Sequence, residues 1–187
     1  MSARHEPQKT SRELGTLELK GFTGVLVSDF YSAYDGLNCL QQRCLIHLMR
    51  DMNQAILDNP FDQELRSVTA PFGALLRSIV KTIDEHGLKQ RHLERYSSAV
   101  ATFFEDLTNN VCESDASKAL QDRLFKSRER LFTFLHHNGV SWNNNIAENA
   151  VKQFSRYREY VRRSVREAGL TEHLVLLSLY QTCRIRV

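Results

Sequence analysis

The sequence predicts an α/β fold that is predominantly helical. The apolar run Gly24–Val27 has the length of a buried strand and lacks polar alternation, which is typical of a parallel sheet. A second candidate strand, Arg43–His47, follows after Phe30–Gln42, a stretch long enough for a crossover with a short helix around Tyr31–Leu37. From Leu48 onward the apolar residues recur with the period of helices.

The helical part is predicted from four apolar stripes, three of which are closed by a helix-ending signal. The stripes together span roughly ninety residues, far more than an ordinary connection in an α/β fold. They run through Leu48–Ile56, ended by Asn59 and Pro60; Leu75–Ile83, ended by His86 and Gly87; Leu93–Leu107; and Leu120–Leu135, closed at Asn138 and Gly139, where we expect a left-handed cap.

A polar cluster, Ser141–Asn145, separates this block from a further amphipathic stripe, Ile146–Val165, and Thr171–Arg184 supply a last predicted helix. We therefore expect one domain with four parts. These are a polar leader (1–20), a strand–helix–strand unit (21–50), a helical insertion (51–138), and a segment carrying the long helix and a C-terminal helix (139–187).

The composition is that of a water-soluble globular protein. The chain has 187 residues, of which 42% are hydrophobic and 25% charged, and this balance excludes a disordered or low-complexity protein. The longest apolar stretch, Leu174–Tyr180, is far short of the ~20 residues that a membrane span requires, and Met1–Thr10 lacks the apolar core of a signal peptide. Four scattered cysteines indicate reduced thiols, so we expect a cytoplasmic protein without a membrane partner.

The positive charge of the chain is concentrated at its C-terminal end. Residues 149–187 carry 8 Lys and Arg against 3 Asp and Glu, although the whole chain has a net charge of only +3. Such a segment suits a polyanion such as nucleic acid, and a solvated basic helix without a partner has the same charge pattern.

Two carboxylates stand out by their predicted positions. Asp29 follows the first strand, at the end where α/β folds place ligands, and Glu148 lies in the first turn of the long helix. Carboxylates from separate elements are what a pair of hard divalent cations requires. Both residues also have a structural interpretation, because Asp29 can cap the short helix near Tyr31, and Asn145 and Glu148 have the spacing of a capping box.

The sequence gives a weaker indication of zinc. Cys44 and His47, with Cys39 nearby, resemble half of a zinc site. A structural zinc ion takes four ligands, usually as two close pairs, and neither His136 with His137 nor the remaining cysteines form a suitable second pair. A buried thiol beside a hydrogen-bonded histidine is the more common arrangement.

Four blocks of the chain resemble the transposases of insertion sequence family 66, in the same order and at similar spacing. The blocks are Gly24–Asp35, Gln42–Asp51, Trp142–Ala150 and Leu177–Arg184, so the resemblance covers about residues 12–187. It implies a DDE transposase that cleaves and joins DNA at transposon ends, with a ribonuclease-H-like fold whose helical insertion separates the second and third acidic residues.

By this resemblance Asp29 corresponds to the second acid and Glu148 to the third. These carboxylates would hold two Mg²⁺ ions for strand cleavage and transfer, and Asn144, Asn145 and Lys152 would line or flank the site. Lys152, Arg156, Arg162 and Arg163 would contact DNA phosphates. Alternatively, Glu148 and Lys152 form an ordinary i,i+4 ion pair and the arginines keep the helix soluble.

The chain also departs from the family pattern. The first acid of the family lies on a strand far upstream, so we expect an incomplete ribonuclease-H-like fold that keeps two parallel strands. Asp35 falls in the short crossover and cannot replace that acid. We therefore expect the chain to be inactive alone. It would otherwise serve as a non-enzymatic DNA-binding fragment, pair with a full-length transposase, or regain activity with an upstream fragment that supplies the missing strands.

Overall fold

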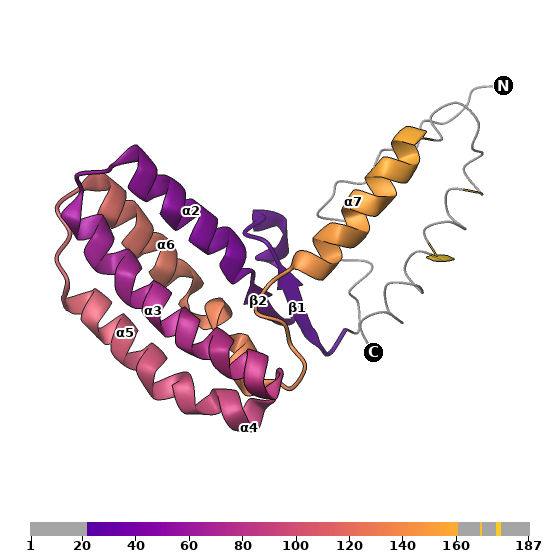
Figure 1. Ribbon diagram of the computed structural model, residues 1–187, viewed down its shortest axis with the longest axis horizontal. Helices are drawn as coiled ribbons and strands as arrows, with labels where there is room; N and C mark the ends of the chain where they lie inside the picture. Colours follow the sequence, from indigo (N-terminus) through magenta and orange to yellow (C-terminus); the bar gives the residue numbers. More distant parts are fainter. Residues whose placement is uncertain (1–21, 161–168, 170–174, 177–187) are drawn as a thin grey trace. The chain divides into compact units, whose positions relative to one another are not determined.

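The computed structural model describes residues 22–160, 169 and 175–176. The chain divides into two compact units, Met1–Asn143 and Asn144–Val187. The first contains two strands and a bundle of helices, and the second contains helix α7 (Figure 1). The polar leader at residues 1–20 and most of the C-terminal helix expected at 171–184 lie outside the described residues.

The first unit begins with a small parallel sheet. Strands β1 (Val25–Ser28) and β2 (Leu40–Arg43) pair in parallel, with Val25 opposite Leu40 and Ser28 opposite Arg43. The short helix expected in the crossover is a 3-10 helix, η1 (Ser32–Tyr34). The predicted first strand, with Asp29 directly after it and a parallel neighbour, is confirmed. Its burial is not, because Val25, Leu26 and Val27 are only partly buried and Ser28 alone is buried.

The predicted position of the second strand, Arg43–His47, is wrong. The strand ends at Arg43, Cys44 is the N-cap of the next helix, and α2 runs through Leu45–Asp58. Leu45, Leu48 and Met52 are all buried, and this spacing fits one face of a helix. The apolar run that looked like a strand is therefore the first buried turn of α2.

The true second strand looks polar in sequence because its buried side chains are hydrogen-bonded rather than apolar. Gln42 is completely buried, and its Nε2 donates to the carbonyl oxygens of Leu131 (2.8 Å) and Arg43 (2.7 Å). Its Oε1 accepts from the backbone N–H of Phe134 at 3.0 Å. One glutamine thus joins β2 to the end of the helical block, and these bonds remove the usual cost of burying an amide.

The helical block is confirmed as helices over the predicted stripes. Gly139 has a positive φ of 74°, as a left-handed turn requires, but it follows η3 rather than closing a long helix directly. The elements are α3 (Gln63–His86), α4 (Gln90–Leu93), η2 (Glu94–Tyr96), α5 (Ser97–Asn109), α6 (Asp115–Leu131) and η3 (Thr133–His136).

Helix α3 is longer than its stripe predicted, because it begins at Gln63 and continues through Pro71. Proline lacks the N–H for an internal helix bond, so a helix that contains it needs compensating packing. Val68 and Phe72, on either side of Pro71, are almost completely buried. Phe72 contacts Phe103 of α5 and Phe132, with ring centroids 5.7 and 6.1 Å apart.

The second unit is described through α7 (Asn145–Tyr160), which confirms the first part of the predicted amphipathic helix. Its expected continuation to Val165 lies outside the described residues. In the part of the chain that the structure describes, no helix combines the length and the apolar character needed to cross a bilayer.

The N-termini of α3 and α6 share an acidic cap. The carboxylate of Asp62 accepts hydrogen bonds from the backbone N–H of Leu65 (2.9 Å) and from the hydroxyl of Ser114 (2.5 Å). Glu64 accepts from the backbone N–H groups of Glu113 and Ser114, at 2.7 and 3.0 Å. These hydrogen bonds, that from Ser114 foremost, hold the pKa of Asp62 below its usual value.

We expect Asp62→Asn to lower the melting temperature at neutral pH, because the ionised carboxylate is the form that the two helix ends stabilise. A carboxyl group with a lowered folded-state pKa stabilises the fold above its unfolded-state pKa and loses this effect as the pH falls through the lowered value. The difference between the variant and the wild type should therefore shrink in acid. Thermal unfolding from pH 7 to pH 3 measures this difference. Asp84→Asn, at an exposed position within α3, is the matched control, and equal effects of both variants would contradict the shared cap.

We expect Gln42→Leu to destabilise the first unit strongly, although leucine has a similar size. The substitution leaves the Leu131 carbonyl and the Phe134 N–H buried without their partner, and each such group costs about 1–3 kcal/mol. Urea denaturation measures the loss. Gln54→Leu, on the exposed face of α2, is the control. If Gln42→Leu has the same free energy of unfolding as the wild type, the buried glutamine does not hold β2 to the helices.

Candidate functional site

Asp29 lies directly after β1, at the C-terminal end of the parallel sheet. Its Oδ1 accepts a hydrogen bond from the backbone N–H of Tyr31 at 3.0 Å. The N-cap of η1 is Tyr31, so Asp29 does not cap this helix as the structural interpretation predicted. Its side chain instead forms an Asx turn with the backbone N–H of Tyr31. Among residues 22–143 no hydrogen-bond donor reaches Oδ2, so within the first unit this carboxylate oxygen is open to a ligand.

The backbone of Asp29 is fixed by a buried arginine at the end of the neighbouring strand. Arg43 is 3% exposed, and its Nη1 donates to the carbonyl oxygen of Asp29 (2.6 Å) and to the hydroxyl of Ser28 (2.9 Å). The Ser28 hydroxyl also donates to the Asp29 carbonyl, at 3.1 Å. The backbone N–H of Cys44 donates to the Ser28 carbonyl at 2.8 Å, which ties the ends of both strands together.

Asp35 compensates the buried charge of Arg43. Its Oδ1 accepts from Nη2 of Arg43 and from Nη1 of Arg130 on α6, the latter at 2.5 Å. The side chain of Asp35 is 42% exposed, but its charge is already balanced by two guanidinium groups. Asp35 is thus an ion-pair partner of both Arg43 and Arg130.

Glu148 lies in the first turn of α7, as predicted. Its backbone N–H donates to the carbonyl of Asn144 at 3.0 Å, so Asn144 precedes the helix and Asn145 is its first residue. The capping box that places Asn145 at the cap is therefore wrong by one position. The Glu148 side chain is 21% exposed, and its Oε2 lies 3.7 Å from Nζ of Lys152, so the predicted i,i+4 ion pair is present.

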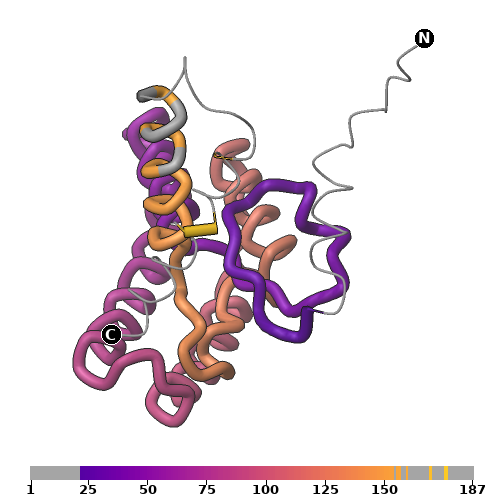
Figure 2. The backbone as a smooth tube through the Cα atoms, turned by 90° about the vertical axis from the view of Figure 1, so that its right-hand side faces the viewer, coloured from indigo at the N-terminus to yellow at the C-terminus, as the bar shows by residue number. Residues whose placement is uncertain are grey.

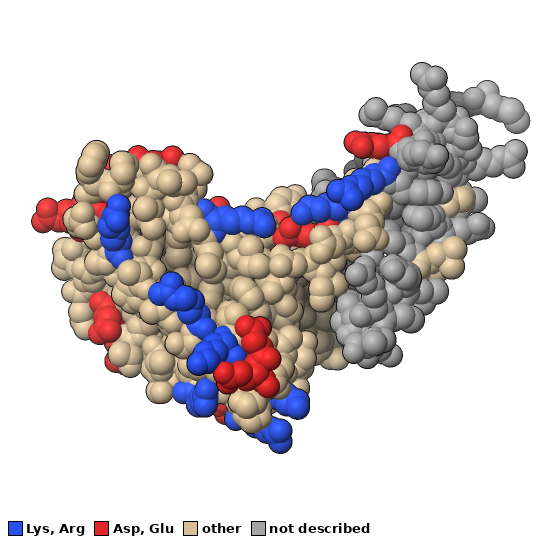
Figure 3. Space-filling model, in the orientation of Figure 1, with Lys and Arg blue, Asp and Glu red and all other residues tan. Residues whose placement is uncertain are grey.

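The basic residues predicted to contact DNA are only partly within the described residues. Lys152 is 64% exposed and Arg156 is also exposed, and basic side chains are visible on the surface of α7 (Figure 3). Arg162 and Arg163 lie outside the described residues. The contact of these four residues with phosphate stays a prediction.

Cys44 and His47 are brought together by the first turn of α2. Cys44 is completely buried, His47 is partly buried, and the Cys44 Sγ and a His47 ring nitrogen lie within 4.8 Å of each other. Two donors are half of a tetrahedral zinc shell. Among residues 22–143, no third His, Cys, Asp or Glu joins them at this distance.

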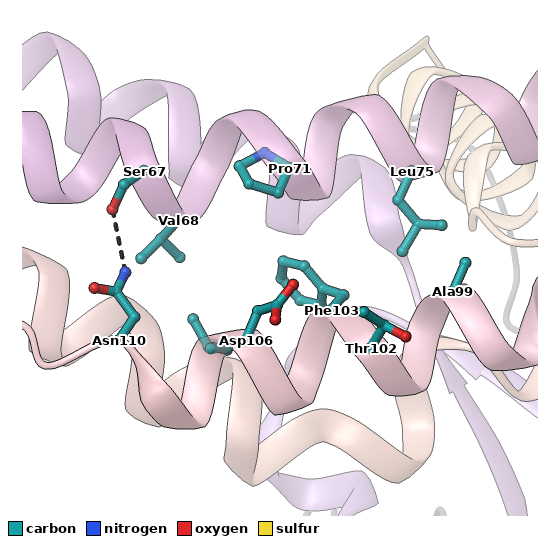
Figure 4. Close-up of a pocket in the computed structure, with 10 residues that line it drawn as sticks. Ser67, Val68, Pro71, Leu75, Ala99, Thr102, Phe103, Asp106 and Asn110 are labelled. Carbon is teal, nitrogen blue, oxygen red and sulfur yellow. Dashed lines mark hydrogen bonds between the residues drawn. The ribbon is translucent and has the colours of Figure 1, made fainter.

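A groove lies between α3 and α5 on the helical bundle (Figure 4). It has a volume of about 480 Å³, and Asn110 bridges its end by donating to the Ser67 hydroxyl at 3.2 Å. The groove does not include Asp29 or the residues that hold it. Its lining consists of Ser67, Val68, Pro71, Leu75, Ala99, Thr102, Phe103, Asp106, Leu107 and Asn110.

Sequence reasoning missed the residues that hold Asp29. Arg43 was assigned to the start of a strand rather than its end, and nothing in its neighbourhood marked it as buried. Arg130 contacts Asp35 across 95 positions of the chain, and no local pattern predicts such a pair. The available signal was the position of Arg43 just before the apolar turn of α2.

Comparison with known proteins identifies the family of the chain. The family model described as "Transposase IS66 family" matches residues 4–171. No curated protein and no solved structure matches the chain. Because the family model covers most of the chain, from before β1 to beyond α7, the chain belongs to the IS66 family of transposases.

Proposed function

We propose that this chain takes part in DNA transposition as part of the catalytic domain of a DDE-type transposase with a ribonuclease-H-like fold. Asp29 and Glu148 act in it as the second and third acidic residues. The observation that carries the proposal is Asp29, which follows a parallel strand and keeps one carboxylate oxygen open, in a chain of a transposase family. Ligands of α/β folds gather at this end of parallel strands.

The donors of the proposed site suit Mg²⁺. Hard divalent cations prefer oxygen ligands, and both candidate residues are carboxylates, whereas Cys44 and His47 offer the donors that zinc prefers. When bound, Mg²⁺ would activate the attacking oxygen and stabilise the leaving oxygen of a phosphodiester. Asp29 would contribute Oδ2, because its Oδ1 already accepts the Tyr31 N–H. Glu148 would contribute a carboxylate that Lys152 also approaches.

The proposed fold requires further strands beside β1. A two-stranded sheet is marginal by itself, and β2 is joined to the helical block through Gln42 and through Thr133, whose hydroxyl donates to the Gln41 carbonyl at 2.7 Å. Among the described residues, β1 pairs only with β2, so its other edge is open to another strand. We propose that strands carrying the first acid pair there, and that the 187-residue chain does not cleave DNA without them.

The exposed basic residues of α7 fit a role in holding DNA. Lys152 and Arg156 can neutralise phosphates, and we propose that Arg162 and Arg163 extend this contact along the chain. We propose that the protein acts in the cytoplasm. The basic surface of α7 also supports a second candidate function, in which a non-enzymatic fragment binds DNA through this helix or pairs with a full-length transposase through the helical block.

We expect the purified chain to show no Mg²⁺-dependent cleavage of transposon-end DNA. Co-expression with an upstream fragment that supplies the remaining strands should restore strand cleavage and transfer. Asp29→Asn and Glu148→Gln should then each abolish the restored activity, because loss of a carboxylate leaves an incomplete oxygen shell. A gel-based cleavage assay measures this. Metal-dependent cleavage by the chain alone that is lost in Glu148→Gln would contradict the proposed incompleteness.

We expect salt-sensitive DNA binding that depends on α7. Lys152→Ala and Arg156→Ala should each weaken binding for all DNA sequences alike and should reduce the slope of log K against log salt by about 1. Fluorescence anisotropy between low and high salt measures the slope. Arg77→Ala, which removes an exposed cation from α3, is the control. An equal effect of Arg77→Ala would show that the binding is not located on α7.

A further inference from the structure

We infer that Arg43 is a positioning residue for Asp29, and that α6 of the helical insertion helps to hold it through Asp35. This inference rests on the proposed function, in which Asp29 is a metal ligand. It adds that the buried guanidinium of Arg43 sets the direction in which the Asp29 carboxylate points. The helical insertion would then support the chemistry directly instead of only separating two acids in the sequence.

The guanidinium of Arg43 contacts both residues at the end of β1. Nη1 donates to the Asp29 carbonyl at 2.6 Å and to the Ser28 hydroxyl at 2.9 Å. The Asp29 carbonyl thus accepts two hydrogen bonds, one from Arg43 and one from Ser28. Two hydrogen bonds to the Asp29 carbonyl restrict the rotation of the backbone from which the Asp29 side chain projects. Oδ1 is fixed in turn by the Tyr31 N–H, so the open Oδ2 points in one direction.

The other nitrogen of Arg43 connects this end of the sheet to α6. Nη2 donates to Asp35 Oδ1, which also accepts from Arg130 at 2.5 Å. A buried guanidinium without a carboxylate partner would be strongly destabilising, so Asp35 is what allows Arg43 to stay buried beside Asp29. The Asp35 carboxylate thus forms ion pairs with both Arg130 and Arg43.

A second arginine of α6 holds the start of the same loop. The guanidinium of Arg123 lies over the ring of Phe30, 4.5 Å from its centroid, and also donates to Asp51 at 2.5 Å. Phe30 is the residue immediately after Asp29. Residues 29–35 therefore contact α6 at both ends, and Figure 2 shows this loop, in indigo, beside that helix.

The arrangement requires an arginine and not only a positive charge. The two nitrogens of one planar guanidinium reach the Asp29 carbonyl and the Asp35 carboxylate at the same time. A lysine has a single ammonium group on a flexible stem and cannot reproduce this fork. Arg43→Lys keeps the charge and most of the volume, so it separates the positioning effect from the effect of charge.

The test uses NMR on the full 187-residue chain, with two readouts. The first is hydrogen exchange of the Tyr31 amide without metal, which reports how firmly Asp29 Oδ1 is held. The second is line broadening of residues 28–31 during a Mn²⁺ titration, which gives an apparent Kd. We expect Arg43→Lys to speed the Tyr31 exchange and to weaken Mn²⁺ binding about 10-fold or more, as loss of a group that orients a ligand does. Arg128→Gln is the control, because Arg128 lies on α6 over the Phe104 ring and not on this loop.

Asp35→Asn provides a second test in case Arg43→Lys does not fold. It changes a partly exposed side chain by one atom and removes the charge that balances Arg43. We expect faster Tyr31 exchange and weaker Mn²⁺ binding, with the circular dichroism spectrum unchanged. Wild-type exchange and wild-type Kd in both Arg43→Lys and Asp35→Asn would overturn the inference.

Asp29→Asn separates this inference from the function on which it rests. We expect it to remove the Mn²⁺ broadening of residues 28–31. If the broadening persists in Asp29→Asn, the assignment of Asp29 as a metal ligand is wrong. If it disappears in Asp29→Asn but Arg43→Lys and Asp35→Asn behave as the wild type, the proposed function stands and only the role of Arg43 is wrong.

Discussion

The structure of the first unit depends on three buried polar side chains in β2. Gln41, Gln42 and Arg43 are at most 5% exposed, in positions where a strand next to a helical core would ordinarily carry apolar residues. Each is paired with backbone or carboxylate groups of other elements. Gln41 donates to the Tyr34 carbonyl at 2.7 Å, Gln42 bonds to α6 and η3, and Arg43 bonds to the end of β1. Such buried hydrogen bonds are directional, so they fix the register of the sheet against the helices more specifically than apolar contacts alone.

These three polar side chains connect the strands to the helical insertion and to the loop that carries Asp29. An insertion of this length between two acidic residues could be a separate domain with its own core. Here the core of the first unit runs continuously from Leu45 and Leu48 of α2 to Leu131, the last residue of α6, and Leu135 of η3. The loop that carries Asp29 contacts α6 through Phe30 and Asp35. The insertion and the strands therefore pack as one unit. A substitution in α6 can shift the position of Asp29 through Phe30 or Asp35.

The sequence predicted those features that follow from local patterns. The apolar run before Asp29, the helix stops at Asn59 and Gly87, and the ion pair between Glu148 and Lys152 depend on spacing within a few residues. The position of β2 was mispredicted because the strand was assigned from the apolar residues alone. The apolar residues after Arg43 belong to a helix, and the strand itself is polar. The support of Asp29 was missed because Arg130 reaches Asp35 from 95 residues away, and only the tertiary fold brings them together.

We expect the open oxygen of Asp29, held in place by Arg43, to bind a divalent cation. Anomalous diffraction from crystals of the chain soaked in Mn²⁺ locates such a cation. The expected Mn²⁺ peak lies about 2.0–2.1 Å from Asp29 Oδ2, the distance that small hard divalent cations such as Mg²⁺ adopt, with the Arg43 guanidinium still on the Asp29 carbonyl. A cation bound at Cys44 and His47, with none at Asp29, would contradict it.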